Sequence, residues 1–428
     1  MRILIVSDSA WDDRISFGNT ISNWFDNWDN AVFYSIYGRD SLPQNHICNN
    51  YYRVSPLSLL KNLFWPSKTG DRVFVDSSMD CINSNDKEKE LIQKAQQGKK
   101  EWMYLVIDLA YSTGIWKTKE YRNFIKEANP DVVFFFALAS PFLFQNLRYL
   151  KRNTNAKFAS FIPDDVYNVY LKDNSLRNIL RRRRFKEMMK MSDVIYGASD
   201  MLKSAYEKLL GIEISTLFKG CTLTTLKNSV NNPIRIVYAG NLLWGRATIL
   251  GRLAEELENL NHDGVKAALE IYTGTFITPE MERKLNRGRS SIIVGRRPYE
   301  EIVSTMKAAD IVLHVESFDK DSVEIVRYSF STKIIDCLQS GSTMMVIGPK
   351  GIASVEYPRQ IPGAIVVDDL NNIRSVLYEI VANPQTLIDR SKAINEFAKK
   401  NHTIEVVREN LQKDFKSLLT KSSRNENY

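Results

Sequence analysis

The feature of this chain that most constrains its fold is an alternation of short apolar runs with amphipathic segments, which begins again after a polar connector at residues 227–233. Strands separated by helices build parallel sheets that carry helices on both faces. Predicted strands lie at residues 2–7, 31–37, 132–138, 157–162 and 193–198 before the connector, and at 235–238, 268–272, 291–294, 311–315, 342–347 and 364–367 after it. The pattern predicts an α/β protein of two Rossmann-like, doubly wound domains that face a central cleft, with a ligand at the carboxyl ends of the strands.

The length and composition also support a two-domain globular protein. A chain of 428 residues exceeds one ordinary hydrophobic core. We place an N-terminal domain at residues 1–228 and a C-terminal domain at 229–400, followed by a helix at 401–420 and a disordered polar tail at 421–428. Hydrophobic residues make up 44% of the chain and charged residues 25%, and no apolar run reaches the roughly 20 residues that span a bilayer.

The N-terminus and the cysteines favour a cytoplasmic protein. The first residues enter a predicted strand directly and lack the apolar core and small-residue cleavage site of a signal peptide. The four cysteines (Cys48, Cys81, Cys221 and Cys337) have no CxxC spacing, which disfavours a zinc site or a disulfide framework. We therefore expect the protein in the cytoplasm, either free or at the inner face of the cell membrane.

The first segment with a chemical signal follows the predicted strand at 235–238. This strand opens into a glycine turn at Gly240, with Asn241 next to it and Arg246 just beyond. A glycine at such a turn lets the backbone come close to a ligand. The segment therefore predicts a close approach to an anion, with a cation at hand.

The second segment is a predicted helix at 332–339. Ser331 or Thr332 is a good N-cap, and the free N–H groups of a helix N-terminus favour phosphate. Lys333 and Asp336 are three residues apart and share a helix face, so the acid is placed to accept hydrogen bonds from a ribose. Two interpretations stay open: a nucleotide-diphosphate site that needs no metal, or a well-capped amphipathic helix with a Lys333–Asp336 ion pair.

Two further segments raise the alternative of membrane contact. Residues 181–184 are four consecutive arginines, followed by Lys186, and form either a solvated helix face or a patch attracted to an anionic membrane or an acidic acceptor. The apolar, aromatic stretch at 57–65 is either a packed core helix or an interfacial segment. Nucleic acid is not an expected partner, because no recognised nucleic-acid module surrounds the basic run.

Taken in order, the segments at 238–242, 294–295, 299–302, 309–315 and 331–341 resemble the donor-binding half of retaining GT-B glycosyltransferases of the group 1, or family 4, type. In the N-terminal half the resemblance is architectural. It implies a nucleotide-diphosphate sugar as donor, no metal or other cofactor, and a C-terminal helix that packs back on the N-terminal domain. The donor-binding residues that it implies are Gly240, Asn241, Gly295, Ser331, Thr332 and Asp336.

The resemblance also implies roles for the two cations. Arg246 falls where the family has the lysine of its Arg…Lys diphosphate pair, and Asn241 stands where the arginine often is, so one of the two cations is missing. Arg246, Lys333 and the helix end would stabilise the leaving diphosphate as its charge develops. Asp336, in place of the second of two glutamates that mark the family, would hold the ribose.

The chain departs from the family at the acids. Tyr328 stands where the first of the two glutamates is expected. A longer loop at 317–330 replaces the usual short one, and Glu316 or Asp319 would instead reach the donor sugar. Asp164 follows a predicted strand where the family often has a His-Asp pair, and it is either a carboxylate near the sugar or the acceptor, or part of a helix N-cap. Gly18 and Asn19 look like the flexible glycine loop on the acceptor side.

The sequence therefore predicts a hexosyl- or other glycosyltransferase that moves a sugar, with retention, to a polysaccharide, lipid-linked or other cell-envelope acceptor. Asp319-Lys320-Asp321 has the Asp-x-Asp form that other glycosyltransferases use for a metal, but on this fold cations and a helix end do that work, so no metal is expected. Tyr328 and Asn241 motivate one alternative, a non-catalytic GT-B subunit that binds a nucleotide or a partner. A nucleotide-sugar epimerase is a further alternative, although it needs more acid–base groups.

Overall fold

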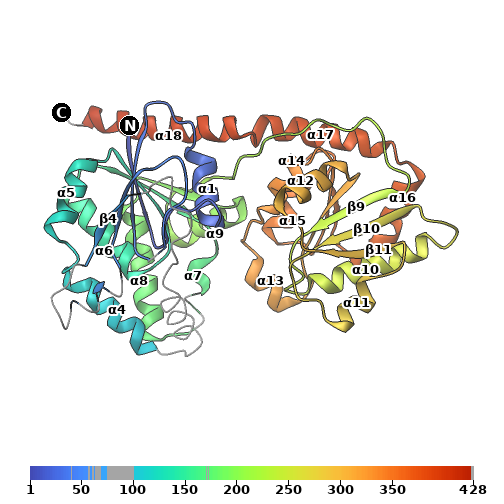
Figure 1. The fold of residues 1–428 in the computed structure, drawn as a ribbon, viewed down its shortest axis with the longest axis horizontal. Coiled ribbons are helices and arrows are strands. Elements are labelled where there is room, and N and C mark those ends of the chain that lie inside the picture. Colours follow the sequence, from blue (N-terminus) through green and yellow to red (C-terminus); the bar gives the residue numbers. More distant parts are fainter. Residues whose placement is uncertain are drawn as a thin grey trace. The chain divides into compact units, whose positions relative to one another are not determined.

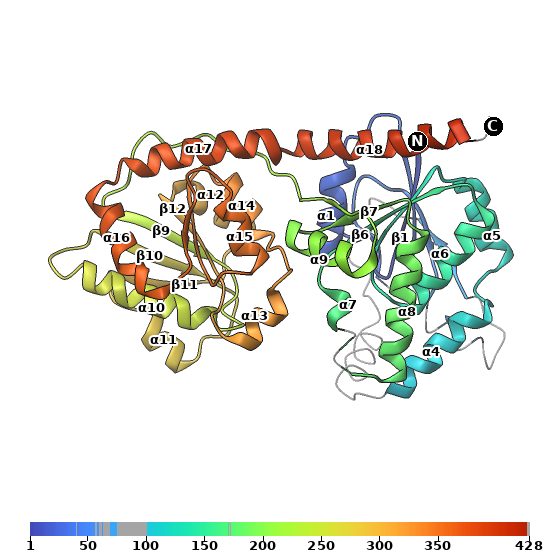
Figure 2. The ribbon, with the colours of Figure 1, turned by 180° about the vertical axis from the view of Figure 1, so that it is seen from behind.

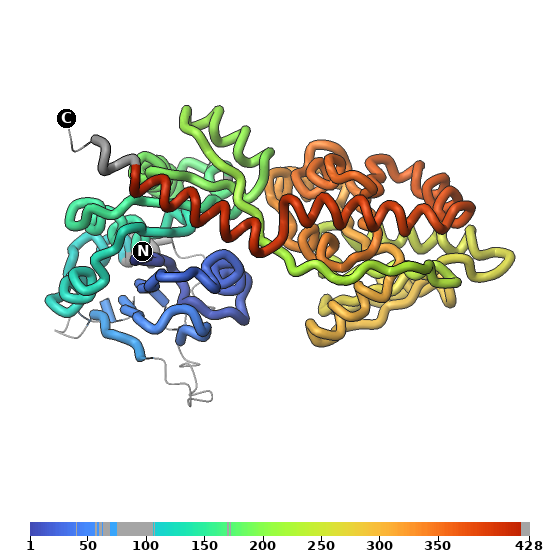
Figure 3. The backbone as a smooth tube through the Cα atoms, turned by 90° about the horizontal axis from the view of Figure 1, so that it is seen from above, coloured from blue at the N-terminus to red at the C-terminus, as the bar shows by residue number. Residues whose placement is uncertain are grey.

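The computed structural model describes residues 1–39, 41–55, 58–59, 62, 69–74, 101–169, 171 and 173–425. The chain divides into two compact units. Unit 1 comprises Met1–Ala198, Lys203–Leu217 and Arg408–Tyr428, and unit 2 comprises Ser199–Leu202 and Phe218–Val407. The main division therefore follows Leu217, earlier than the connector at which the sequence placed it. The chain runs from unit 1 into unit 2 and returns to unit 1 at its C-terminus (Figure 3).

Unit 1 is built on a sheet that has eight strands within the described residues, in the order β4-β3-β2-β1-β5-β6-β7-β8. The strands are β1 (Arg2–Ser7), β2 (Val32–Tyr37), β3 (Asn50–Arg53), β4 (Asp71–Val73), β5 (Val132–Phe136), β6 (Lys157–Ile162), β7 (Val194–Gly197) and β8 (Ser215–Thr216). All neighbours pair in parallel except β3 and β4. The central strands β1 and β5 are almost continuously buried, because helices cover both faces of the sheet (Figure 1).

The helices of unit 1 include part of the last helix of the chain. They are α1 (Ser16–Phe25), α4 (Glu101–Thr113), α5 (Lys119–Ala128), α6 (Pro141–Asn153), α7 (Val166–Val169), α8 (Leu176–Met191), α9 (Asp200–Leu210) and the later turns of α18 (Ile404–Asn425). The Phe415 ring of α18 packs against Phe25 and Trp28, and Arg408 forms an ion pair of 3.3 Å with Asp26. Aromatic packing and a charge pair therefore hold α18 on this unit.

Unit 2 is built on a six-stranded, fully parallel sheet in the order β11-β10-β9-β12-β13-β14. Its strands are β9 (Ile234–Ala239), β10 (Ala267–Tyr272), β11 (Ser291–Gly295), β12 (Ile311–Val315), β13 (Thr343–Ile347) and β14 (Ile365–Val367). The strand order reverses between β9 and β12, which is the point where open α/β sheets bind ligands at the carboxyl ends of their strands.

Helices cover both faces of the unit 2 sheet (Figure 2). They are α10 (Arg246–Leu260), α11 (Pro279–Leu285), α12 (Tyr299–Ala308), α13 (Lys320–Val326), α14 (Lys333–Gln339), α15 (Ala353–Arg359), α16 (Ile373–Ala382) and α17 (Thr386–Asn401). Alternate residues of one strand enter opposite cores: Leu313 of β12 packs with α10 and α16, whereas Val312 packs with α12 and α14. This alternation fixes which side chains of each strand face the α14 layer.

The structure corrects several predicted boundaries. Helix α10 begins at Arg246 rather than at 250, because Trp244 and Gly245 both have positive φ angles and turn the chain directly into the helix. The loop expected after Glu316 contains α13, which Asp319 caps by accepting a hydrogen bond from the Ser322 N–H at 3.0 Å. The tail predicted to be disordered from residue 421 is helical as far as Asn425.

Membrane-related predictions are tested only in part. Of the stretch at 57–65, only residues 58, 59 and 62 are among those described, so the prediction of an interfacial segment falls mostly outside them. Within the part of the chain that the structure describes, no helix is both long enough and apolar enough to cross a bilayer.

Candidate functional site

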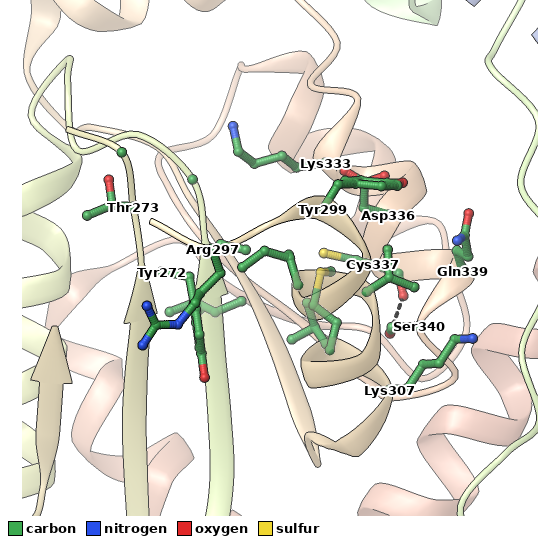
Figure 4. A pocket seen from close by; sticks show the side chains of 18 of the residues that line it. Tyr272, Thr273, Arg297, Tyr299, Lys307, Lys333, Asp336, Cys337, Gln339 and Ser340 are labelled. Carbon is green, nitrogen blue, oxygen red and sulfur yellow. Dashed lines mark hydrogen bonds between the residues drawn. The ribbon is translucent and has the colours of Figure 1, made fainter. Parts of the chain in front are cut away.

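A cavity of about 250 Å³ lies at the carboxyl ends of the strands of unit 2. The ends of β9, β10 and β11 form one wall, and side chains from α12 and α14 form the other. Lys333 and Lys307 lie toward opposite ends of the cavity, with Asp336 and Cys337 between them (Figure 4). Such a position, at the strand-order reversal, is where this class of sheet binds its ligand.

A glycine directly after β9 forms part of the cavity wall. A Cβ placed on Gly240 would lie 2.6 Å from Lys333 Cε and 2.8 Å from the Tyr238 hydroxyl oxygen, so any larger residue would displace both. The Tyr238 hydroxyl donates a hydrogen bond of 2.6 Å to the Asn241 carbonyl and so fixes the turn that follows. As the sequence predicted, this turn brings bare backbone to the cavity, and Gly240 is one of the lining residues.

Arg246 opens α10, but protein oxygens hold its guanidinium. Its Nε donates to the Val315 carbonyl at 3.1 Å, one terminal nitrogen donates to Asn241 Oδ1 at 2.8 Å, and the other donates to Glu316 Oε2 at 2.9 Å. Arg246 is 8% exposed and is not among the residues that line the cavity. Through these hydrogen bonds Arg246 links the turn after β9 to the end of β12.

Glu316 does not extend toward a sugar, so that expectation is wrong. The residue is 2% exposed, and both carboxylate oxygens are used, one by Arg246 and the other by His314 Nε2 at 3.0 Å. Burial alone would raise the pKa of Glu316, but the hydrogen bond and charge of His314 and the charge of Arg246 outweigh it and lower the pKa below its usual value. Glu316 is therefore an ionised partner of Arg246.

Lys333 is one of the cationic residues that line the cavity. It opens α14, and among the described residues its amine has no hydrogen-bond or ion-pair partner. Burial lowers the pKa of Lys333, and the nearby charge of Arg246 lowers it further, against the opposing effect of Glu316 and Asp336. An anion bound in the cavity would pair with this partly buried charge and neutralise it.

Asp336 lies one turn further along α14 and also lines the cavity. Burial raises the pKa of Asp336, while the charges of Lys219 and Lys333 act to lower it. The alternative of an ion pair between Lys333 and Asp336 is not what the structure shows, because the Lys333 amine points away from the carboxylate (Figure 4). The two residues therefore offer a separate cation and acid to a ligand.

The prediction that a Ser331 or Thr332 side chain caps the N-terminus of α14 is wrong. Thr332 occupies the N-cap position, but its backbone is in the helical region and its side chain makes no capping hydrogen bond. The Ser331 N–H donates instead to Ser354 Oγ at 2.8 Å, which ties the segment to α15. Neither Ser331 nor Thr332 lines the cavity. Gly295, by contrast, lines it at the end of β11 with a φ of +85°.

The residues predicted in the N-terminal half belong to unit 1. Gly18 and Asn19 lie within α1 and do not form a flexible loop. Gly18 is needed for packing, since a Cβ there would come 2.1 Å from the Asp12 carbonyl oxygen. Asp164 lies in the bend between β6 and α7, where its carbonyl accepts a hydrogen bond from the Val166 N–H at 2.7 Å.

Some lining residues had no signal in the sequence analysis. Thr273, Gly274, Arg296 and Lys307 all border the cavity, as does Tyr299, which lies in one of the segments on which the resemblance rested. Gly274, which follows the predicted strand at 268–272 after one residue, could have indicated this wall, whereas Lys307, near the end of α12, becomes part of the site only through the fold. Among the described residues, no group of three or more His, Cys, Asp or Glu side chains is arranged to hold a metal ion.

The comparisons with known proteins concern the fold. No protein-family model and no curated sequence matches the chain. HepE from Anabaena, solved in complex with UDP, superposes with a TM-score of 0.63 at 11% identity over 97% of this chain and 100% of that one. Sucrose-phosphate synthase from Thermosynechococcus elongatus has a TM-score of 0.60 at 11% identity, covering 98% of this chain and 100% of that one.

A trehalose 6-phosphate synthase from Burkholderia multivorans is similar to the same degree, with a TM-score of 0.60 at 11% identity over 98% of this chain and 99% of that one. At such low identity the likeness shows the fold alone. It confirms the predicted fold class: the chain has the GT-B fold, with two Rossmann-like α/β units.

Proposed function

We propose that this protein is a glycosyltransferase that takes a sugar from a nucleotide-diphosphate donor bound in the cavity of unit 2. The observation that carries the proposal is Lys333, a partly buried cation without a partner among the described residues, set beside the bare backbone of Gly240 and one turn before Asp336. The diphosphate would bind at Lys333, and Asp336 would accept hydrogen bonds from the ribose. The structure of HepE with UDP supports this choice of ligand.

Catalysis would depend mainly on stabilising the negative charge that develops on the leaving diphosphate. The transfer breaks the bond between the anomeric carbon and the β-phosphate oxygen, forms a bond to an acceptor oxygen, and passes the acceptor's proton to the departing diphosphate. Lys333 would stabilise the charge that develops on that diphosphate, and its partial burial strengthens the effect. Arg246 would act indirectly, by holding the turn after β9. Retention of configuration rests on the resemblance to family 4 enzymes.

A thermal-shift screen tests the donor site. UDP, GDP, ADP and TDP are each added to the wild type, to Asp336→Asn, and to Asp389→Asn as a control at an exposed carboxylate of the same unit. At about 100 times its Kd, the correct nucleotide should raise Tm by roughly 5–10 °C. The shift should persist in Asp389→Asn and be largely lost in Asp336→Asn. If no nucleotide moves the Tm of the wild type, the proposal fails.

One observation favours a second candidate, a non-catalytic GT-B subunit that binds a nucleotide. The two cations near the β9 turn are Arg246 and Lys333, and Glu316 already neutralises Arg246. Less charge is then left to stabilise a leaving diphosphate. A nucleotide that shifts Tm without any sugar transfer or donor hydrolysis would support this candidate. Asp336 is the only carboxylate among the described lining residues, so the cavity gives an epimerase little acid–base chemistry.

We propose a polysaccharide or lipid-linked glycan as acceptor, with peripheral contact to an anionic membrane. Two arginines of the basic run in α8 already form ion pairs within the protein. Arg184 pairs with Asp108 at 2.9 Å and Arg183 with Glu187 at 2.9 Å. Sedimentation with phosphatidylcholine vesicles, with and without phosphatidylglycerol, tests the contact. Binding should require the anionic lipid and should weaken about tenfold or more in high salt. Binding that ignores both lipid charge and salt would contradict it.

A further inference from the structure

Four cations of unit 1 lie together where the turn before α5 meets α6. One precedes the N-cap of α5, one is on α5 and two are on α6, and we call them the basic cluster: Lys117, Arg122, Arg148 and Arg152. Arg122 Nε donates a hydrogen bond of 3.1 Å to the Lys117 carbonyl. The Lys117 amine lies 5.3 Å from the centre of the Trp116 ring and 5.8 Å from that of Tyr149. Since Tyr149 stands between the two arginines of α6, this contact brings the amine to that helix.

The basic cluster has no counter-ion of its own. None of its four members forms an ion pair with a residue that the structure describes. The acids of α5 lie elsewhere: Glu120 and Glu127 are seven residues apart and share one face of the helix, where Glu127 pairs with Arg72 at 2.5 Å. Arg122 follows Glu120 by two residues, about 200° around the helix, and so lies on the opposite face. Helix α5 therefore separates its acids from the basic cluster.

Without a bound anion the members of the cluster repel one another. Arg148 and Arg152 are four residues apart on α6, and like charges at this spacing destabilise a helix. Burial lowers the pKa of Lys117, and the charges of the three arginines of the cluster lower it further. The ring faces of Trp116 and Tyr149 hold the Lys117 amine in place but do not neutralise its charge. A multivalent anion bound among the four cations would remove this repulsion.

We propose that the basic cluster is a binding site for a phosphate monoester, carried by a lipid head group or by a soluble phosphorylated molecule. Such a group has a charge of about −1.5 to −2 at pH 7 and three strong acceptor oxygens. The guanidinium forks of the arginines match phosphate oxygens in geometry, and the lysine supplies a point charge. The basic cluster belongs to unit 1 and the donor cavity to unit 2, so this site is additional to the proposed function.

Acetylation of Lys117 by acetic anhydride, followed by mass spectrometry of its peptide, tests the inference on the full chain. Lys186 is the reference in the same sample, because it is an exposed lysine of unit 1 whose amine also lies over a ring, 5.6 Å from the centre of Tyr167. Glycerol 1-phosphate should slow the acetylation of Lys117 about fivefold or more at saturation, relative to sodium chloride of equal ionic strength. The acetylation of Lys186 should not change.

A variant and a lipid arm complete the test. Arg152→Gln removes an exposed cation of the cluster and should raise the concentration of glycerol 1-phosphate for half-protection about fivefold. Lys208→Gln is the control, an exposed lysine on α9 of the same unit, and should leave that concentration unchanged. Phosphatidylcholine vesicles with and without phosphatidic acid distinguish the sources: protection at lower phosphate concentrations by phosphatidic acid than by glycerol 1-phosphate assigns the site to a lipid head group, and protection by glycerol 1-phosphate alone assigns it to a soluble ligand.

Three results would overturn the inference. Neither form of phosphate protects Lys117, or glycerol 1-phosphate slows Lys117 and Lys186 equally, which would show that the cluster is only a solvated surface. Protection that is unchanged in Arg152→Gln would show that the four cations do not act on one ligand. Because the measurement follows a single lysine of unit 1, its failure would leave the proposed donor site of unit 2 unaffected.

Discussion

Replacement of Lys333 by alanine should lower kcat/KM for sugar transfer by about 10²–10³-fold. The residue is a partly buried cation of the cavity, and the part of its interaction that grows as the diphosphate leaves is lost with the amine. Lys307→Ala is the matched control, since Lys307 lines the same cavity but is exposed, and it should change kcat/KM less than about fivefold. Steady-state transfer assays on both variants provide the measurement.

Lys333 should favour catalysis but lower the stability of the folded protein. Its folded pKa lies below the ordinary 10.5, so the folded state binds this proton less tightly than the unfolded chain does. The charged lysine therefore opposes folding below the folded pKa, and this opposition disappears as pH rises from the folded pKa toward 10.5. Lys333→Met should accordingly unfold at a higher temperature than the wild type near neutral pH, without ligand. A lower Tm, or full activity, would show that Lys333 is a structural residue.

The strands could be predicted from the sequence because a parallel sheet covered on both faces requires nearly continuous apolar runs. The structure accordingly has β12 at Ile311–Val315, as predicted, and β6 at Lys157–Ile162. The glycine turn at Gly240 was also predictable, since a strand followed by glycine and a cation is a local pattern. These features depend on residues that are close together along the chain.

The pairing of the charged residues could not be predicted in the same way. Glu316 lies 70 residues after Arg246, and only the positions of β12 and α10 bring the two together. Gly18 lies in α1 close against the backbone of Asp12, a contact that the sequence does not display. Arg296 and Arg297 are identical residues side by side, and only the ion pair with Glu301 tells them apart. Site roles here follow from tertiary partners.

Glu316→Gln should lower the free energy of unfolding by about 3–5 kcal/mol. The amide keeps the shape of the carboxylate but cannot neutralise Arg246, so a buried positive charge is left without its counter-ion. Urea denaturation followed by tryptophan fluorescence measures the change. Glu324→Gln is the control, because Glu324 is an exposed acid on α13 and should stay within about 0.5 kcal/mol of the wild type.

Two further measurements distinguish a structural role of Glu316, as the partner of Arg246, from a role in which it acts on the sugar. The pKa of a glutamate is ordinarily 4.5 and is lower in the folded protein here, so the stability that the pair contributes should be complete above pH 4.5 and be lost as pH falls through the folded value. Replacing both partners, Arg246→Met with Glu316→Leu, should recover much of the stability lost in Glu316→Gln, because no charge remains buried. A variant Glu316→Gln that loses kcat but keeps its full stability would instead place this carboxylate in the chemistry.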